Sequence, residues 1–470
     1  MKYTAIILGL TLLIVLGCKK DHPDSLTDLV NPMIGTSGHG HTFPGASVPF
    51  GMVKLSPDTY NEGWDWCSGY HYSDSSIMGF SHTHLSGTGR GELLDVLMMP
   101  TTGAVHFNPG PRENPDLGYR SRFSHKNEVA RLGYYSVILD DYHIKAELTA
   151  TLRAGFHRYT FDADEEANLI IDMAHSFKTD SILNGYIKIV NDTLIVGSHR
   201  SKGWGEGNEK YWVKHEVFFA ARLSKPIKSS SFSVDGDIIE NVKEVQGTFV
   251  KTNLVFDLAR SKQLLIKVGI SGVDIDGAIK NVDSEIPDWN FDIVAMQADQ
   301  KWSKMLNTFQ VTDTNVARKQ TFYTSVYHAC MAPFTYSDAD GRYMGFDHKI
   351  HKAEGFTDMT GLSLWDTFRA ANPLYTLMAP SVVSDIVNSM LAQFDEYGLL
   401  PIWPLCSSET NCMIGYHSVP VIVDAYLKGI DGFDIDKAYE AMKKSAMQDD
   451  FDIQYLKKYN YIPRDLAPPM

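Results

Sequence analysis

Three short segments in the last third of the chain each carry a tryptophan or a cluster of polar side chains. They are Ser363–Ala370, Pro401–Pro404 and Ser408–Gly415. An aromatic ring can pack against the C–H face of a sugar, while carboxylates, guanidinium groups and amides bond to hydroxyls. The three segments are therefore candidates for a carbohydrate-binding site. The alternative is that Trp365 and Trp403 pack between helices and that Asp366 caps a helix.

A second group of candidate side chains lies in Gly79–Gly89, where two histidines alternate with threonine and leucine. If His82 and His84 lie on a strand, both rings point to one face. That spacing suits zinc, with Asp95 or His71 as a further ligand. The alternative, favoured because the spacing shows no third ligand, is a pair of hydrogen-bonded histidines that support the fold or contact substrate.

The elements that would position these residues belong to an ordinary globular protein. The chain has 470 residues, enough for two or three domains, with 44% hydrophobic and 21% charged residues. Its net charge of −14 argues against nucleic acid or an anionic membrane surface as the main partner. Four scattered cysteines beyond the N-terminal region do not form a disulfide framework, and we expect buried thiols, although Cys406 and Cys412 could pair.

Residues 1–18 have the pattern of a targeting segment. Lys2 is followed by an apolar run over 5–17, which is too short to span a bilayer as a helix. The run ends in Val15–Cys18, which resembles a bacterial lipoprotein cleavage box. We therefore expect a signal peptide, lipidation of Cys18, and a location in the periplasm or at the outer-membrane surface of a Gram-negative bacterium. A plain secretory signal is the alternative.

The pattern from about Tyr134 to Ile270 predicts short antiparallel strands. Asp140–Asp141 and Asn191–Asp192 each separate two apolar segments, which is typical of β-hairpins. Further strands are expected at 169–173, 217–223, 248–258 and 264–270. Many strands without interleaved helices favour a β-sandwich.

From Thr312 onwards the apolar residues follow a helical period. Stripes that predict helices lie at 316–331, 382–394, 419–428 and 435–447. Gly398 and Gly429 are expected to end two of them. Helices joined by loops that carry tryptophan and carboxylates favour a barrel of helical hairpins, but Gln310–Met470 is shorter than the roughly 250–350 residues that twelve helices require.

Eight ordered motifs together resemble the N-terminal half of glycoside hydrolase family 92. They are Asn31–Thr36, Phe43–Ala46, Ser68–Tyr72, Gly79–Gly87, Arg153–Tyr159, Asp340–Tyr343, Ser363–Arg369 and Glu409–Gly415. The resemblance implies an antiparallel β-sandwich followed by an (α/α)₆ barrel, here partial. It implies domains at 28–275 and 311–470, linker helices at 276–310 and a tether at 19–27. The sequence departs from the family pattern at Leu405–Ser408 and Arg90.

The family's activity is calcium-dependent, inverting, exo-acting cleavage of α-mannosides. The resemblance implies that Asp366 and Arg369 contact the terminal mannose. Further pocket or rim positions would be Trp64, Trp403, Glu409, Asn411 and His417, with His82 and His84 contributed from the sandwich. None of these matches the family's acid or base, which are expected beyond residue 470, and the calcium ligands are not assigned.

We therefore expect part of an α-mannosidase, with a preference for α-1,2 linkages in N-glycans or mannans, that is inactive in this 470-residue form. The alternative is a surface lipoprotein that binds mannose-terminated glycans without catalysis.

Overall fold

The computed structural model describes residues 25–162, 166–205, 212–258, 261–450 and 452–466. The expected signal peptide, Cys18 and residues 19–24 of the tether lie outside the described residues. The last residues of the expected tether are structured. Ser25 caps the 3-10 helix η1 (Leu26–Leu29) by accepting a bond from the Thr27 N–H, and Leu29 is buried in the helical core.

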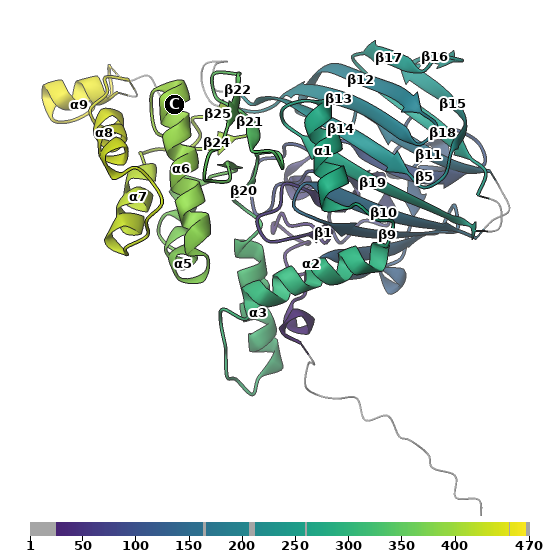
Figure 1. Ribbon diagram of the computed structural model, residues 1–470, viewed down its shortest axis with the longest axis horizontal. Helices are drawn as coiled ribbons and strands as arrows, with labels where there is room; N and C mark the ends of the chain where they lie inside the picture. Colours follow the sequence, from purple (N-terminus) through teal and green to yellow (C-terminus); the bar gives the residue numbers. More distant parts are fainter. Residues whose placement is uncertain (1–24, 163–165, 206–211, 259–260, 451, 467–470) are drawn as a thin grey trace, which may run out of the picture.

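Two antiparallel sheets form the N-terminal domain, as predicted (Figure 1). In spatial order, the first sheet contains β1 (Ala46–Ser47), β2 (Lys54–Asp58), β4 (Gly79–Ser81), β5 (Leu97–Thr102), β11 (Ala167–Asp172), β18 (Val250–Phe256), β15 (Ile227–Val234) and β16 (Asp237–Glu240). The second contains β17 (Glu244–Gly247), β12 (Ser181–Asn191), β13 (Leu194–Lys202), β14 (Lys214–Leu223), β19 (Gln263–Ser271), β10 (Ala154–Phe161), β9 (Ile144–Ala150), β8 (Tyr134–Leu139) and β7 (Val129–Arg131).

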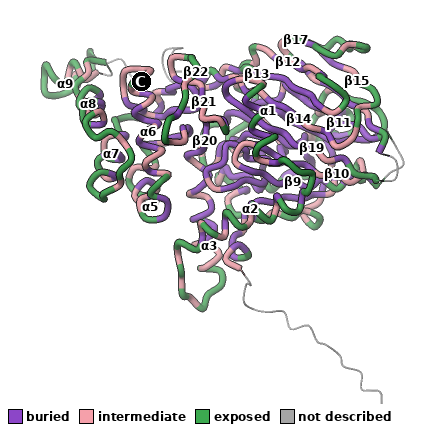
Figure 2. The backbone as a smooth tube through the Cα atoms, in the orientation of Figure 1, coloured by how far each residue is buried: buried purple, intermediate pink, exposed green. Residues whose placement is uncertain are grey.

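Both predicted hairpins are confirmed. Leu139 pairs with Ile144 at the turn between β8 and β9, and Asn191 pairs with Leu194 between β12 and β13. Apolar side chains from both sheets meet in one large core. The strand interiors are accordingly buried in Figure 2, whereas the ends and edges of the sheets reach solvent.

Two helices cover the outside of the second sheet. Helix α1 (Ile275–Glu285) approaches β19 so closely that a Cβ at Gly269 would lie 2.2 Å from the carbonyl oxygen of Ala278. Only glycine fits at that position. Helix α2 (Phe291–Leu306) contacts β8, β9 and β10, and Trp302 Nε1 donates a 2.7 Å hydrogen bond to the Ser47 carbonyl.

The remaining helices follow along the chain, and all of them except the last contribute buried side chains to a second core. They are α3 (Val316–Ala329), α4 (Leu364–Thr367), α5 (Ala371–Met378), α6 (Pro380–Tyr397), α7 (Ser418–Leu427), α8 (Ile435–Ala446) and α9 (Ile453–Tyr459). The predicted stripes correspond to α3, α6, α7 and α8, and Gly398 ends α6 in a left-handed conformation, with φ of 94°. The sequence reading missed α5, whose Pro373 lies in the first turn, where a helix does not need the missing N–H.

Short hairpins join the sandwich to the helices (Figure 1). They are β20 (Phe334–Thr335) with β23 (Met359–Thr360), β21 (Arg342–Met344) with β22 (Ile350–Lys352), and β24 (Pro404–Leu405) with β25 (Ser408–Glu409). Within the sandwich, β3 (Ser76–Ile77) pairs with β6 (Ser121–Arg122). The two domains share a buried apolar cluster, and the Lys214 N–H donates to Ser408 Oγ at 3.1 Å.

The described part of the chain contains no helix that is both long and apolar enough to cross a membrane. None of the four cysteines in the described residues forms a disulfide, the possible Cys406–Cys412 bridge included, and all four are buried, so the predicted buried thiols are confirmed.

Candidate functional site

A chain of hydrogen bonds connects two of the predicted sugar-binding segments. Trp403 Nε1 donates to Ser363 Oγ at 2.7 Å, and Ser363 Oγ donates to Asp366 Oδ2 at 2.5 Å. Ser363 precedes the short helix α4 and Asp366 lies in its first turn, while Trp403 comes from the loop before β24. The fold therefore brings these two segments together, with the ring of Trp403 buried and Asp366 exposed.

Glu409 anchors this loop rather than facing solvent. Its carboxylate accepts hydrogen bonds from the backbone N–H groups of Ile402, Trp403 and Asn411 at 2.9, 3.0 and 2.8 Å. Gln393 donates from α6 at 3.2 Å. Burial raises the pKa of Glu409, and the four donors act in the opposite direction. We therefore assign Glu409 a role in shaping the loop.

The loop around Glu409 is held in an uncommon backbone conformation. Cys406, Asn411 and Met413 have φ values of 51°, 52° and 71°, in the left-handed region that side chains other than glycine rarely adopt. Each such residue costs on the order of 1–3 kcal/mol and persists only where surrounding contacts enforce it. Strain of this kind concentrates at binding and catalytic sites, which supports a functional role for 401–413.

Charged and aromatic side chains are exposed beside this loop. Asp366 and Arg369 are exposed, and Trp365 is 42% exposed. The ring of Phe368 lies 4.3 Å from that of His417. Partial burial, and then the charge of Arg369, lower the pKa of His417. An accessible carboxylate and guanidinium beside aromatic rings can bind a sugar by hydrogen bonding and ring packing.

Two tryptophans of the sandwich are further candidates, and one of them, Trp204, lies in the same region. Trp204, which follows β13, contacts Trp403 edge to face at 5.3 Å between ring centroids, and Arg90 lies 5.7 Å from the Trp204 ring. Trp64 is 57% exposed and contacts His41 at 4.8 Å. Sequence reasoning missed Trp204 because no motif surrounds it; two flanking glycines are the only local signal.

His82 and His84 lie in the interior, and both are fully buried. The ring of His82 contacts the Val96 carbonyl at 2.7 Å and His157 Nε2 at 3.0 Å. Burial lowers the pKa of His82 to about 4. This placement does not fit the expected contact of His82 with a sugar.

His84 forms hydrogen bonds with different groups from those that bond to His82. Its ring nitrogens contact the Lys54 carbonyl at 2.7 Å and Asp58 Oδ1 at 2.8 Å. His175 contacts the other oxygen of Asp58. Burial raises the pKa of Asp58, but the two histidines outweigh it and leave that pKa below its usual value. The two histidines serve separate hydrogen-bond networks and do not assemble the zinc site that their spacing allowed, which agrees with the favoured interpretation of hydrogen-bonded histidines.

A calcium site is not evident among the described residues. Calcium takes six to eight oxygen ligands. In the described ranges, only His39, His41 and Asp65 form a group of three or more side chains that could hold a metal ion. Two imidazoles and one carboxylate do not fit the preference of calcium, so we derive no step through that ion.

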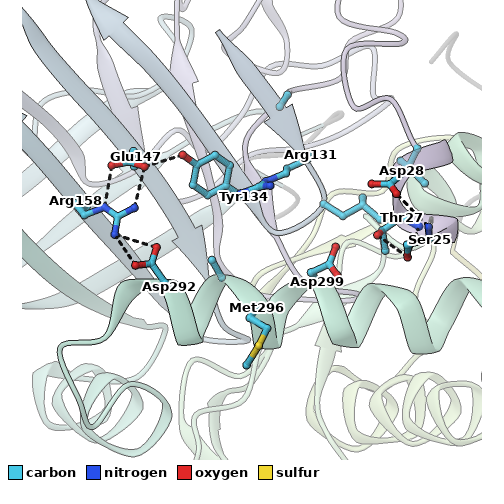
Figure 3. Close-up of a pocket in the computed structure, with 14 residues that line it drawn as sticks. Ser25, Thr27, Asp28, Arg131, Tyr134, Glu147, Arg158, Asp292, Met296 and Asp299 are labelled. Atoms are coloured by element: carbon cyan, nitrogen blue, oxygen red, sulfur yellow. Dashed lines mark hydrogen bonds and ion pairs between the residues drawn. The ribbon is translucent and has the colours of Figure 1, made fainter. Parts of the chain in front are cut away.

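One pocket of about 650 Å³ lies away from these residues, between η1, the edge of the second sheet and α2 (Figure 3). Several of its charged groups are paired with one another. Arg158 bonds to Glu147 at 2.8 Å and to Asp292 at 3.0 Å, and Tyr134 donates to Glu147. The ion pair between Arg158 of β10 and Asp292 of α2 therefore attaches the helix to the sheet.

Two family models match the chain. The glycosyl hydrolase family 92 N-terminal domain matches residues 29–271, and the family 92 catalytic domain matches residues 277–468. The chain therefore belongs to glycoside hydrolase family 92, which confirms the predicted resemblance.

Solved structures agree with this membership. A family GH92 α-mannosidase of Bacteroides thetaiotaomicron in complex with mannoimidazole is 40% identical, with a TM-score of 0.89 over 94% of this chain and 58% of that chain. An inverting GH92 mannosidase from the same species is 26% identical, with a TM-score of 0.82 over 94% and 59% of the two chains. An uncharacterized secreted glycosidase of Arthroderma benhamiae is 26% identical over 89% of this chain and 51% of that protein. The chain thus spans between half and three fifths of the length of these relatives.

Proposed function

We propose that this protein is an exo-acting, inverting α-mannosidase, and that the residues described here hold the terminal mannose. The observation that carries the proposal is the bond from Trp403 to Ser363 and on to Asp366, which joins two of the predicted sugar-binding segments beside the exposed Arg369. The similarity to mannosidases, one of them bound to mannoimidazole and another described as inverting, supports it.

Inversion requires two carboxyl groups about 6.5–9.5 Å apart. One donates a proton to the leaving oxygen, and the other removes a proton from the attacking water. Glu409 is unsuited to either task because its oxygens are engaged by four donors in the interior. We therefore assign neither the acid nor the base role to Glu409, and assign Asp366 and Arg369 to binding and orientation of the sugar.

Asp366→Asn and Arg369→Gln are each expected to weaken binding of α-1,2-mannobiose by roughly tenfold or more, because each removes a charged hydrogen-bonding group worth about 1.5–3 kcal/mol. Titration calorimetry measures the affinity. Asp436→Asn is the matched control, since Asp436 is also an exposed carboxylate in the first turn of a helix. Equal affinity in all four proteins would contradict the assignment.

A mannose-binding protein without catalysis is the second candidate, and the buried, fully bonded state of Glu409 favours it for these residues. Calorimetry alone does not separate the two, because both require binding. An assay for free mannose released from an α-1,2-mannoside does separate them, because release requires catalysis. Binding without release by a protein extended through any further coding sequence would support the second candidate.

We further propose calcium dependence, a preference for α-1,2 linkages, and N-glycans or mannans as substrates. These rest on the family resemblance rather than on described side chains. Mannose release should be lost after treatment with a chelator and should return with calcium. Activity indifferent to the chelator would remove the calcium proposal.

We also propose export and attachment to the outer membrane through a lipidated Cys18. The secreted glycosidase of Arthroderma benhamiae supports export alone. Cys18→Ser is expected to abolish incorporation of a labelled fatty acid and to move the protein from the membrane fraction to the soluble fraction. Cys67→Ser, at a buried thiol of the sandwich, is the control and should leave both unchanged.

A further inference from the structure

Two histidines and an aspartate converge at the surface of the sandwich next to Trp64. His39, His41 and Asp65 each offer one ligand atom, and these atoms all lie within 4.8 Å of one another. His39 Nδ1 is 2.5 Å from Asp65 Oδ1. His39 and Asp65 are accessible, with side chains 75% and 33% exposed, whereas His41 is only 6% exposed.

His41 is the unusual member of this group. Its Nε2 is buried and has no hydrogen-bond partner among the described residues. A buried nitrogen without a hydrogen-bond partner carries a free-energy cost. A cation bonded to Nε2 would remove this cost.

The backbone is constrained to present His41. The residue has φ of 52°, a strained value for a side chain other than glycine. Its neighbour Gly40 lies so close to the carbonyl of Gly35 that a Cβ there would be 2.1 Å from that oxygen. The His41 carbonyl accepts a 2.7 Å hydrogen bond from the Gly87 N–H. The close approach at Gly40 and the hydrogen bond from Gly87 therefore hold the backbone at His41 in this conformation, while the side chains of His39 and Asp65 are accessible to solvent.

The geometry points to a site for a zinc-like divalent cation held by His39, His41 and Asp65. Two imidazole nitrogens and one carboxylate oxygen are ligands that zinc prefers, and calcium does not. Ligand atoms around tetrahedral zinc lie about 3.3–3.5 Å apart, so a small rotation of the two accessible side chains closes the set. The fourth position is open to water. The cation would connect the loop 35–41 to the 3-10 helix η2 (Trp64–Trp66).

This site is distinct from Asp366 and Arg369 and does not depend on the proposed mannosidase activity. The test uses the chain without a polyhistidine tag, stripped of metal with a chelator. Zinc chloride is then titrated in competition with a chromophoric chelator. We expect one zinc per chain and a rise in the melting temperature of a few degrees. His39→Gln and Asp65→Asn should each weaken zinc binding by at least roughly tenfold.

His351→Gln is the matched control. The His351 Nε2 atom is 2.9 Å from Asp347 Oδ1, so His351 forms a similar histidine–aspartate pair, and among the described residues it belongs to no group of three ligand atoms that could hold a metal ion. This variant should bind zinc like the unmodified chain. Circular dichroism of the metal-free variants should be unchanged, because His39 is exposed and Asp65 is only partly buried. Absence of stoichiometric zinc, or equal losses in the control and in the two ligand variants, would overturn the site. Calcium chloride in place of zinc should give no comparable stabilisation.

Discussion

Replacing Glu409 by alanine is expected to lower the free energy of unfolding by about 3–5 kcal/mol. The change leaves the N–H groups of Ile402, Trp403 and Asn411 without their acceptor. Each buried donor left unpaired costs about 1–3 kcal/mol, and the lost side chain adds a cavity. Chemical denaturation measures the difference.

A graded series distinguishes the hydrogen bonds from the cavity. Glu409→Gln keeps the volume and one acceptor oxygen but turns an amide towards one of the donors, so about 1–3 kcal/mol is expected. Glu354→Gln, at an exposed position, should change stability by less than about 0.5 kcal/mol. Amide exchange of Ile402, Trp403 and Asn411 should accelerate in the Glu409 variants only. Equal stability of Glu409→Gln and the control would show that the carboxylate does not hold the loop.

Lys54 is expected to make the protein more stable as the pH rises from about 7 towards 10. Its side chain is buried beneath the shared apolar cluster, and Nζ lies 3.8 Å from the centre of the Phe334 ring. Nζ has no hydrogen-bond partner among the described residues. Burial lowers the pKa of Lys54 to about 7. In this pH range the unfolded chain therefore binds more protons than the folded one, and stability increases with pH.

Lys54→Met tests this directly, because methionine keeps much of the apolar stem and removes the charge. At pH 6 the free energy of unfolding of the variant should exceed that of the unmodified chain by up to about 5 kcal/mol. This difference should disappear near pH 10. Denaturation at several pH values measures both slopes, and their difference isolates Lys54 from other groups that titrate. Parallel slopes would contradict a lowered pKa. Lys352→Met, at an exposed position, is the control and should leave the slope unchanged.

Local sequence was sufficient where neighbouring residues determine the structure. Asp140–Asp141 and Asn191–Asp192 favour turns, and the apolar segments beside them pair across those turns. The stripe of α6 and its terminating Gly398 were likewise readable, because helix periodicity and a left-handed end are local properties. The order of strands within each sheet joins segments far apart in the chain and was not readable in the same way.

The residues of the candidate site show the same distinction between what local sequence indicates and what the tertiary structure decides. The sequence identified Asp366, Arg369, Trp403 and Glu409 as polar and aromatic candidates from their types and motifs. Only the tertiary structure separated their tasks: Glu409 is buried under four hydrogen bonds, whereas Asp366 is exposed at the end of the bond from Trp403 through Ser363. Spacing does not encode burial.

His82 and His84 show most clearly what the sequence alone could not determine. Alternation suggested that His82 and His84 share a ligand, yet their partners include His157, 75 residues from His82, and Asp58, 26 residues from His84. The convergence of His39 and His41 with Asp65 depends equally on the fold. Residue type determines which chemistry is available, and long-range packing decides which groups meet, because hydrogen-bond and metal partners are set by distance in space rather than along the chain.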